Sequence, residues 1–490
     1  MAEDAVENLV SMAVATGAIE PLDRVYLRNR VYSLVGDQLH VDQSGTGVEA
    51  ISAALVQTAV DHHKIEDSQT ARELLDGQLM DLITPRPSQV NERFWQAYQN
   101  GPEAATKYFY QLSQANNYIK TSAIAKNIVF NTETTFGDLE ITINLSKPEK
   151  DPKAIAAAAT TKADGYPLCQ LCLENEGYLG RLGYPARSNH RVIRMTIGGR
   201  PWGFQYSPYA YFGEHAIFLD QAHTPMHINR QTFTNLFEII TQLPQYFVGS
   251  NADLPIVGGS MLSHEHYQGG RHTFPMMKAP IATAFTLPDF PSVKAGVVKW
   301  AMSTIRLIGN DPQTLADAAE QIRVKWQAYD DPAVSIKAYD GELRHHTVTP
   351  IAYRHGDNYI LDLVLRDNQT SATYPDGIFH PHQDVQHIKK ENIGLIEVMG
   401  RAILPARLKT EMQEVEQFLL DEPNDMAEYH RVWAENLKQT RTFTSTNVAE
   451  TLDQAVGQVF GRVLEDAGVF KWDAAGRAAQ QRFIDRLMEQ

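Results

Sequence analysis

The chain has 490 residues, 43% of them hydrophobic, and a formal net charge of −15. This length allows roughly two to four domains, and the acidic balance argues against a duplex nucleic-acid binder, which carries a basic surface. Two cysteines cannot form a disulfide framework. The sequence has neither a signal-peptide pattern nor an apolar run of the ~18 residues that a membrane span needs. We therefore expect a soluble cytoplasmic protein.

Residues 1–125 are predicted to form a helical N-terminal region. The apolar positions of Val48–Val60 are spaced for one buried helix face. Ser68, ahead of Glu73 and Leu74, marks another helix start. No catalytic signature stands out here, which favours a structural role for the region.

Residues 126–290 are predicted to form a second domain in which strands dominate. Phe136-Gly137-Asp138 lies between two β-rich runs and predicts a hairpin. A helix is expected from Asp151, with Pro152 in its first turn. Further on, strands are predicted for HRVIRMTI, WGFQYSPYAYF and HAIFLD, and a helix for residues 228–243.

Residues 291–490 are predicted to form a third domain with a helical tail. Strands are expected at VKAGVVKWAM, TVTPIAY and NYILDLVL, and a helix at PQTLADAAEQIRVKWQAY. The last ~80 residues have amphipathic helical patterns. Runs of strands and runs of helices are separated more than alternated, which favours an α+β fold.

The most informative motif is VGGSMLSHEHYQGGRHTFPM at residues 257–276. On a strand, alternate residues share a face, so His264, His266 and Gln268 would point one way and Glu265 and Tyr267 the other. An imidazole can act as a covalent nucleophile toward phosphorus, and a carboxamide can hold a phosphate oxygen. The same letters also fit a polar surface strand or a metal site without a nucleophile.

A second motif is Cys169-Gln170-Leu171-Cys172. A redox role is disfavoured because no thioredoxin-like βαβ pattern surrounds it. With His223, which is expected to end a strand, and His264, the pair would complete a Cys2His2 set suited to structural zinc. Two inert buried thiols are the alternative. If His264 binds the metal, the same strand fixes His266 in space.

Two further groups of residues are candidates for ligand contacts. Five arginines and no acidic residue occur between Arg181 and Arg200, namely Arg181, Arg187, Arg191, Arg194 and Arg200. Guanidinium groups suit phosphate oxygens, although each of these residues could equally lie on a solvated sheet face. In the C-terminal half, His380 and His382 form an H-P-H pair, with His387 nearby. A second metal there is an open alternative to a structural role.

Taken together, these motifs resemble the second class of galactose-1-phosphate uridylyltransferases, relatives of the histidine-triad superfamily. The resemblance runs from about residue 118 to 408 and includes YPLCQLCLENEGYLGR, FQYSPYAYFGEHAIFLDQAHTPMHI, SHEHYQGGRHTFPM and HIKKENIGLIEVMGRAILPARL. The commoner enzymes carry H-P-H-G-Q, which corresponds here to His264-Glu265-His266-Tyr267-Gln268. Glu265 and Tyr267 depart from that pattern. The resemblance implies two histidine-triad-like antiparallel sheet units with flanking helices.

The resemblance also implies roles for individual residues. The nucleophile would be His266, the phosphate-binding glutamine Gln268, and the zinc ligands Cys169, Cys172, His223 and His264. Phosphate contacts would fall on Asn251, Gly259 and Ser260, with Arg181 and Arg187 as further substrate-binding residues. The spacing before the motif is one residue longer than in the family.

The implied reaction is a ping-pong exchange. UDP-glucose would uridylylate His266 and release glucose 1-phosphate, and galactose 1-phosphate would then form UDP-galactose. A homodimer is expected from the family alone. The alternatives are a histidine-triad nucleotide hydrolase, a dinucleoside polyphosphate phosphorylase, or a zinc-stabilised binding module without catalysis.

Overall fold

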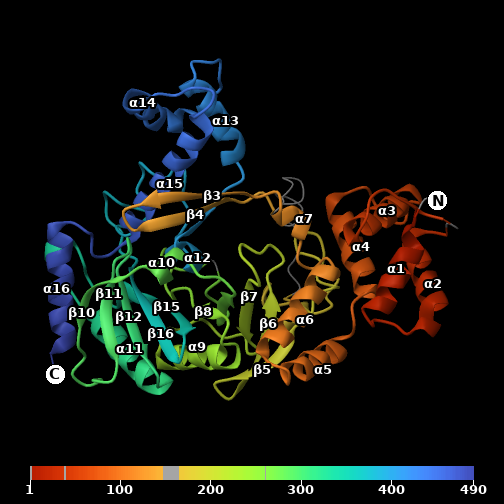
Figure 1. The fold of residues 1–490 in the computed structure, drawn as a ribbon, viewed down its shortest axis with the longest axis horizontal. Helices are drawn as coiled ribbons and strands as arrows, with labels where there is room; N and C mark the ends of the chain where they lie inside the picture. Colours follow the sequence, from red (N-terminus) through yellow and green to blue (C-terminus); the bar gives the residue numbers. More distant parts are fainter. Residues whose placement is uncertain (1–2, 38–39, 147–164, 260, 490) are drawn as a thin grey trace. The chain divides into compact units, whose positions relative to one another are not determined.

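The computed structural model describes residues 3–37, 40–146, 165–259 and 261–489 (Figure 1). The chain divides into two compact units. Unit 1 comprises Met1–Ala125, Ser146–Ala210 and Glu214–His223, and unit 2 comprises Lys126–Leu145, Tyr211–Gly213 and Thr224–Gln490. The helix expected from Asp151 and the predicted contact Ser260 both lie outside the described residues.

The beginning of unit 1 is helical, as expected. Its helices are α1 (Ala5–Ala15), α2 (Arg24–Val35), α3 (Val48–Asp61), α4 (Gln69–Leu82), α5 (Pro87–Tyr98), α6 (Pro102–Ala115) and α7 (Thr121–Ile124). The helix predicted over Val48–Val60 is α3, and its apolar face places Leu55 in a core with Val31 and Leu79. The hydroxyl of Ser68 accepts a hydrogen bond from the Ala71 amide and so caps α4. The short strands β1 (Glu3–Asp4) and β2 (Asp42–Gln43) pair antiparallel.

Unit 1 also contains three antiparallel strands joined in sequence, β5 (Ile193–Ile197), β6 (Arg200–Tyr206) and β7 (Ala216–Asp220). They are the three strands predicted from aromatic and β-branched runs. Phe94 of α5 and Phe109 of α6 meet Phe204 of β6 edge to face, with ring centroids 6.0 and 5.4 Å apart. These aromatic contacts hold the helices against the strands.

The main sheet of unit 2 has the strand order β10-β11-β12-β16-β15-β8-β9, with antiparallel neighbours throughout. The bounds are β8 (Phe247–Gly249), β9 (His266–Gly270), β10 (Ile281–Phe285), β11 (Lys294–Val298), β12 (Thr304–Gly309), β15 (His346–His355) and β16 (Asn358–Asp367). Helices α9 (Arg230–Gln242) and α11 (Pro312–Gln327) pack on this sheet (Figure 1). Both helices and the strands β11, β15 and β16 match predicted elements, and the predicted α+β class is confirmed.

A smaller sheet in unit 2 has the order β17-β4-β3, formed by β3 (Ile128–Thr134), β4 (Gly137–Ile143) and β17 (Arg401–Leu404). The predicted hairpin is β3–β4, and β17 joins it parallel to β4. Helix α15 (Val448–Ala467) lies on this sheet, and Gly457 gives it close approach because a Cβ there would meet the side chain of Thr132. The other elements of the C-terminal region are α10 (Pro275–Lys278), β13 (Tyr339–Asp340), β14 (Leu343–Arg344), α12 (Leu395–Val398), α13 (Leu408–Leu419), α14 (Arg431–Thr440) and α16 (Ala474–Met488).

A buried ion pair connects β12 and β16. The guanidinium of Arg306 donates to Asp362 through Nε at 2.7 Å and Nη2 at 2.8 Å, and Asp362 is fully buried. We expect Asp362→Ala to lower the free energy of unfolding by about 3–5 kcal/mol, because it leaves a buried guanidinium without its counter-ion. Urea unfolding followed by circular dichroism measures this. The control is Asp317→Ala, which removes the half-exposed partner of Arg230 and should cost less than about 1 kcal/mol. Equal losses for the two variants would contradict the expectation.

Among the described residues, no helix has both the length and the apolar character that crossing a bilayer would demand.

Candidate active site and metal centre

The motif histidines lie at the start of β9. His266 is the first residue of the strand, and Gln268 follows on the same face, paired with Gly249 of β8. His264 precedes the strand, so the expectation that all three share a strand face is wrong for His264. The reason is a contact with a segment that is distant in the sequence. The backbone just before β9 bonds to another loop, with Glu265 N donating to Thr224 O at 2.7 Å.

The imidazole of His266 is held in one orientation. The ring is buried, and its Nδ1 lies 2.8 Å from the carbonyl oxygen of His264. A carbonyl can only accept, so Nδ1 carries the proton and Nε2 keeps its lone pair. Burial lowers the pKa of His266 to about 4, against a smaller opposing effect of that hydrogen bond. The ring is therefore neutral near pH 7, with a nucleophilic nitrogen available.

Tyr267 and Glu265 anchor β9 on the opposite side. The Tyr267 hydroxyl donates to Glu265 Oε1 at 2.6 Å and accepts from Nδ2 of Asn235, in α9, at 3.0 Å. Tyr267 is almost fully buried. Tyr267 thus attaches β9 to α9 on the face opposite His266, as the predicted alternation requires. This contact holds the neighbouring His266 in position.

Asn251 and Gly259 lie against each other in the loop between β8 and β9. A Cβ on Gly259 would stand 2.6 Å from Nδ2 of Asn251, so a larger residue there would displace the Asn251 side chain. Asn251 Oδ1 in turn accepts a hydrogen bond from Leu395 N, at the start of α12, at 2.9 Å. The sequence pattern did not indicate this link to residues 394–395, because a contact across 144 positions has no local signal.

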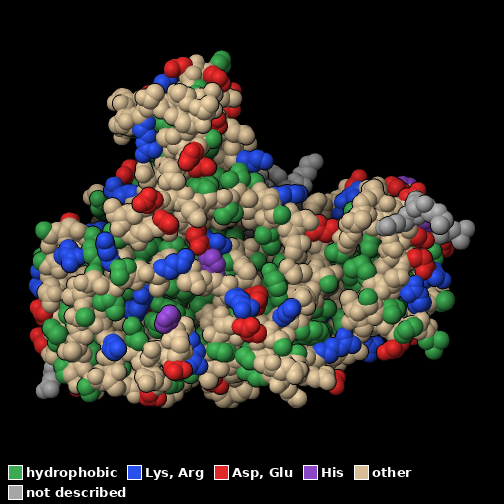
Figure 2. Space-filling view, viewed as in Figure 1, with side chains coloured by type: hydrophobic (Ala, Val, Ile, Leu, Met, Phe, Trp, Pro, Cys, Tyr) green, Lys and Arg blue, Asp and Glu red, His purple; other side chains and the backbone are tan. Residues whose placement is uncertain are grey.

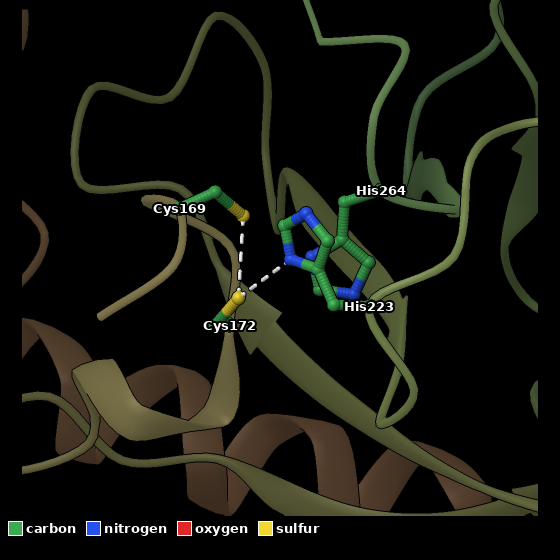
Figure 3. Close-up of side chains that lie close together, drawn as sticks. All are labelled: Cys169, Cys172, His223 and His264. Carbon is green, nitrogen blue, oxygen red and sulfur yellow. Dashed lines mark hydrogen bonds between the residues drawn. The ribbon is translucent and has the colours of Figure 1, made fainter. Parts of the chain in front are cut away.

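The four predicted metal ligands come together. One donor atom from each of Cys169, Cys172, His223 and His264 lies within 4.8 Å of the others (Figure 3). Cys172 Sγ is 3.4 Å from Cys169 Sγ and 3.1 Å from His223 Nδ1. His223 lies three residues beyond the end of β7 rather than on the strand. This is the one such group found among the described residues.

The donor chemistry of this cluster fits a tetrahedral metal ion. Two thiols and two imidazoles are a common ligand set for a closed structural zinc site. Without a metal, burial and the neighbouring Cys169 raise the pKa of Cys172 to about 12. A bound divalent cation reverses this, because it binds the thiolate and expels the proton. Asn175 supports the Cys-x-x-Cys turn by donating to the carbonyl oxygens of Cys169 and Cys172 at 2.8 Å.

Comparison with known proteins identifies the family. Residues 17–225 match the model of the galactose-1-phosphate uridyl transferase N-terminal domain, and residues 239–435 match that of its C-terminal domain. The chain belongs to the galactose-1-phosphate uridylyltransferase family. The resemblance drawn from its motifs is thereby confirmed.

Sequence alignments with named relatives cover most of the length of this chain. The galactose-1-phosphate uridylyltransferase of Pediococcus pentosaceus is 66% identical over 95% of this chain and 96% of its own. That of Lactiplantibacillus plantarum is 66% identical over 94% and 95%. Among solved structures, yeast Ap4A phosphorylase Apa2 aligns with a TM-score of 0.33 and 11% identity, over 67% of this chain and 89% of that one. That likeness is too weak to bear on activity.

Most arginines of the predicted basic cluster make structural contacts in this uridylyltransferase. Arg191 is buried and binds Asp81 at 2.7 Å and several carbonyl oxygens, Arg194 pairs with Glu176, and Arg200 pairs with Asp220. Basic and acidic side chains are interspersed over the face shown in Figure 2 rather than gathered by sign. The local excess of arginine in the sequence is therefore largely neutralised by acidic residues from elsewhere in the chain.

The two arginines proposed as substrate contacts differ in their surroundings. The guanidinium of Arg181 donates to the Tyr166 carbonyl and the Tyr178 hydroxyl and lies over the ring of Tyr184. That of Arg187 lies 5.9 Å from the ring centre of Tyr118 and makes one long hydrogen bond, to the neighbouring Ala186 carbonyl. Arg187 is the less constrained of the two.

The H-P-H pair forms no metal cluster with the described residues around it. His380 Nε2 lies 3.2 Å from Asn392 Oδ1, and His382 stacks on Tyr374 with its Nε2 3.0 Å from the Ile378 carbonyl. Within the described ranges, neither belongs to a group of three or more metal-binding side chains. These contacts favour the structural reading of the pair.

Proposed function

We propose that this family member transfers a uridylyl group from UDP-glucose to galactose 1-phosphate through a covalent intermediate on His266. Its family and the near full-length identity to named uridylyltransferases support a nucleotidyltransferase of galactose metabolism. The observation that supports the nucleophile is the buried, neutral imidazole whose Nδ1 is held by the His264 carbonyl.

The reaction balances as two displacements at one phosphorus. In the first, the lone pair on His266 Nε2 forms a bond to the α-phosphorus of UDP-glucose, and glucose 1-phosphate leaves with the electrons of the broken P–O bond. In the second, a phosphate oxygen of galactose 1-phosphate attacks the same phosphorus, the P–N bond breaks, and UDP-galactose forms. His266 returns to its neutral state.

Other motif residues would hold the uridylyl phosphate during this exchange. Gln268 lies on the face of β9 that carries His266 and offers an amide donor. We propose phosphate contacts from Asn251, Gly259 and Ser260 and anion contacts from Arg181 and Arg187. Fixed donors of this kind stabilise the charge that develops on the phosphoryl oxygens.

We propose that the Cys2His2 cluster binds zinc. Zinc when bound would supply a rigid cross-link, with no part in bond making. Because His264 supplies both a ligand to the cluster and the carbonyl that orients His266, the metal would set the position of the nucleophile indirectly. We also propose the division predicted from the sequence, namely a helical region (1–125), a catalytic domain (126–290) and a C-terminal domain (291–490).

Label exchange tests the proposed reaction. Radiolabelled glucose 1-phosphate, incubated with the enzyme and unlabelled UDP-glucose, is expected to pass its label into UDP-glucose without any galactose 1-phosphate. Only an intermediate that survives release of the first product permits this exchange. A histidine-triad hydrolase or a dinucleoside polyphosphate phosphorylase would consume nucleotide without exchanging label into the sugar nucleotide, and that result would contradict the proposal.

We also propose a homodimer, on the family relationship alone. Multi-angle light scattering of the purified chain measures it directly. A mass of about twice the 55.0 kDa of one chain is expected, and a stable monomer at working concentration would contradict it.

A further inference from the structure

A pocket lies in unit 2 among α14, α15 and the turn after His382. Its volume is about 250 Å³. On α15, Ala455, Val459 and Arg462 line it at helical spacing, and on α14 Trp433 and Leu437 do so one turn apart. The faces of two helices therefore form part of its wall, and the turn that carries Asp384, Val385 and His387 forms the rest.

A chain of hydrogen bonds ends at this pocket. Glu411 of α13 accepts from Nε2 of the fully buried His430 at 3.0 Å. His430 Nδ1 lies 2.9 Å from His387 Nδ1, and His387 lines the pocket. Glu411 also accepts from the Tyr429 hydroxyl at 2.5 Å and from Arg407. Burial raises the pKa of Glu411, but these donors outweigh it and the pKa is lowered, so the acid is ionised near pH 7.

The chain fixes where the protons are. An ionised Glu411 requires a proton on His430 Nε2, and a neutral His430 then accepts at Nδ1. His387 must therefore donate from Nδ1, which leaves the lone pair on its Nε2. Burial is the main cause that lowers the pKa of His387 to about 4, and the positive charge of Arg407 acts in the same direction, so this ring is neutral. The proposed uridylyl transfer makes no use of this lone pair.

The lining selects the chemical class of the ligand. Trp433 lies beside His387, with ring centres 5.0 Å apart, and offers an apolar aromatic surface. Asp384 and Gln458 add polar groups to the lining. Arg462 is already paired with Asp466 at 2.9 Å and faces Asp384 at 3.9 Å, so its charge is offset and the pocket does not favour phosphate. A metal ion is not indicated either, because His387 and Asp384 belong to no group of three metal-binding side chains among the described residues.

We propose that this pocket is an accessory binding site for one uncharged sugar ring, a free aldohexose. A pyranose places an apolar face on an indole and presents hydroxyl donors to acceptors such as His387 Nε2 and the Asp384 carboxylate. The volume is below the ~300–1,000 Å³ of pockets for drug-sized ligands, which fits a single ring. The site is independent of the proposed uridylyl transfer.

The test uses free galactose and free glucose with the full chain, followed by saturation-transfer NMR. Saturating UDP-glucose and glucose 1-phosphate are both present throughout, so that the sugar position of the catalytic site stays occupied. We expect saturable binding of at least one of the two sugars that persists under these conditions. His387→Gln and Trp433→Ala should each weaken it by about tenfold or more, the effect of losing roughly 1.4 kcal/mol of interaction.

Val432→Ala is the matched control, because Val432 neighbours Trp433 on α14 but is 81% exposed and does not line the pocket. It should bind sugar as the unmodified chain does. Circular dichroism and melting temperature identify a variant that fails to fold. If His387→Gln or Trp433→Ala fails to fold, Val459→Phe takes its place in the test. This variant fills the pocket, leaves the hydrogen-bond chain intact and should block binding. Absence of saturable binding, or binding that none of the pocket variants weakens, would overturn the proposal. Label exchange between sugar phosphates reports separately on the proposed function.

Discussion

Replacing His266 by alanine is expected to abolish turnover, lowering kcat/KM by about four orders of magnitude or more. The reason is that a methyl side chain has no atom able to bond to phosphorus, and no other imidazole takes the place of His266 at the start of β9. Intact-protein mass spectrometry after rapid quenching should show one uridylyl adduct on the unmodified enzyme with UDP-glucose. That adduct should disappear when galactose 1-phosphate is added, and it should never form on His266→Ala.

The control for this experiment is His355→Ala. His355 is exposed at the end of β15, so its loss should leave both the adduct and the rate unchanged. Gln268→Ala separates holding the phosphate from attacking it, because the adduct should still form, but more slowly. If the His266→Ala variant formed the adduct at the normal rate, the assignment of the nucleophile would be wrong.

Local features of the fold were predictable because they depend on a few neighbouring residues. The β3–β4 hairpin turns at Thr135 and Phe136 and resumes at Gly137, whose φ of +109° is open to glycine at little cost. Helix α4 begins where the Ser68 hydroxyl can cap an amide. In both cases the chemistry that ends or begins an element is contained within about four residues, so the pattern carries its own explanation.

Pairings between distant segments were not predictable in the same way. Strand β17 lies parallel to β4 with Arg401 opposite Glu140, and the two side chains form an ion pair at 2.6 Å. These residues are 261 positions apart. Which strand neighbours which is decided by the packing of the whole core, and one sequence carries no local mark of it. The chain from Glu411 through His430 to His387 was missed for the same reason.

The candidate active site contains both a local feature that could be predicted and a long-range contact that could not. The motif placed His266 and Gln268 on one strand face, which the structure bears out, because the alternation is a local property of β9. It also extended that strand to His264, which was wrong. The start of the strand is set by a bond from Glu265 to the carbonyl oxygen of Thr224, a residue about forty positions earlier. His264 therefore lies before the strand, and its imidazole joins the cluster with Cys169, Cys172 and His223.

Replacing Cys172 by serine is expected to remove the metal and with it part of the stability and activity. The unmodified chain should carry about one zinc ion, measured by mass spectrometry of the metal, and the variant far less, because a hydroxyl is a poor substitute for a thiolate ligand. Each tenfold loss of zinc affinity lowers the stability of the folded chain by about 1.4 kcal/mol at fixed free zinc.

The melting temperature of Cys172→Ser should therefore fall, and added zinc should raise it less than in the unmodified chain. Activity should fall as well, because His264 would lose its fixed position and the carbonyl that orients His266 would move with it. His227→Ala is the matched control, since His227 is exposed and only four positions beyond His223. It should keep both zinc and rate. Full zinc content and an unchanged melting temperature in Cys172→Ser would show that the cluster is a pair of buried thiols beside two histidines rather than a metal site.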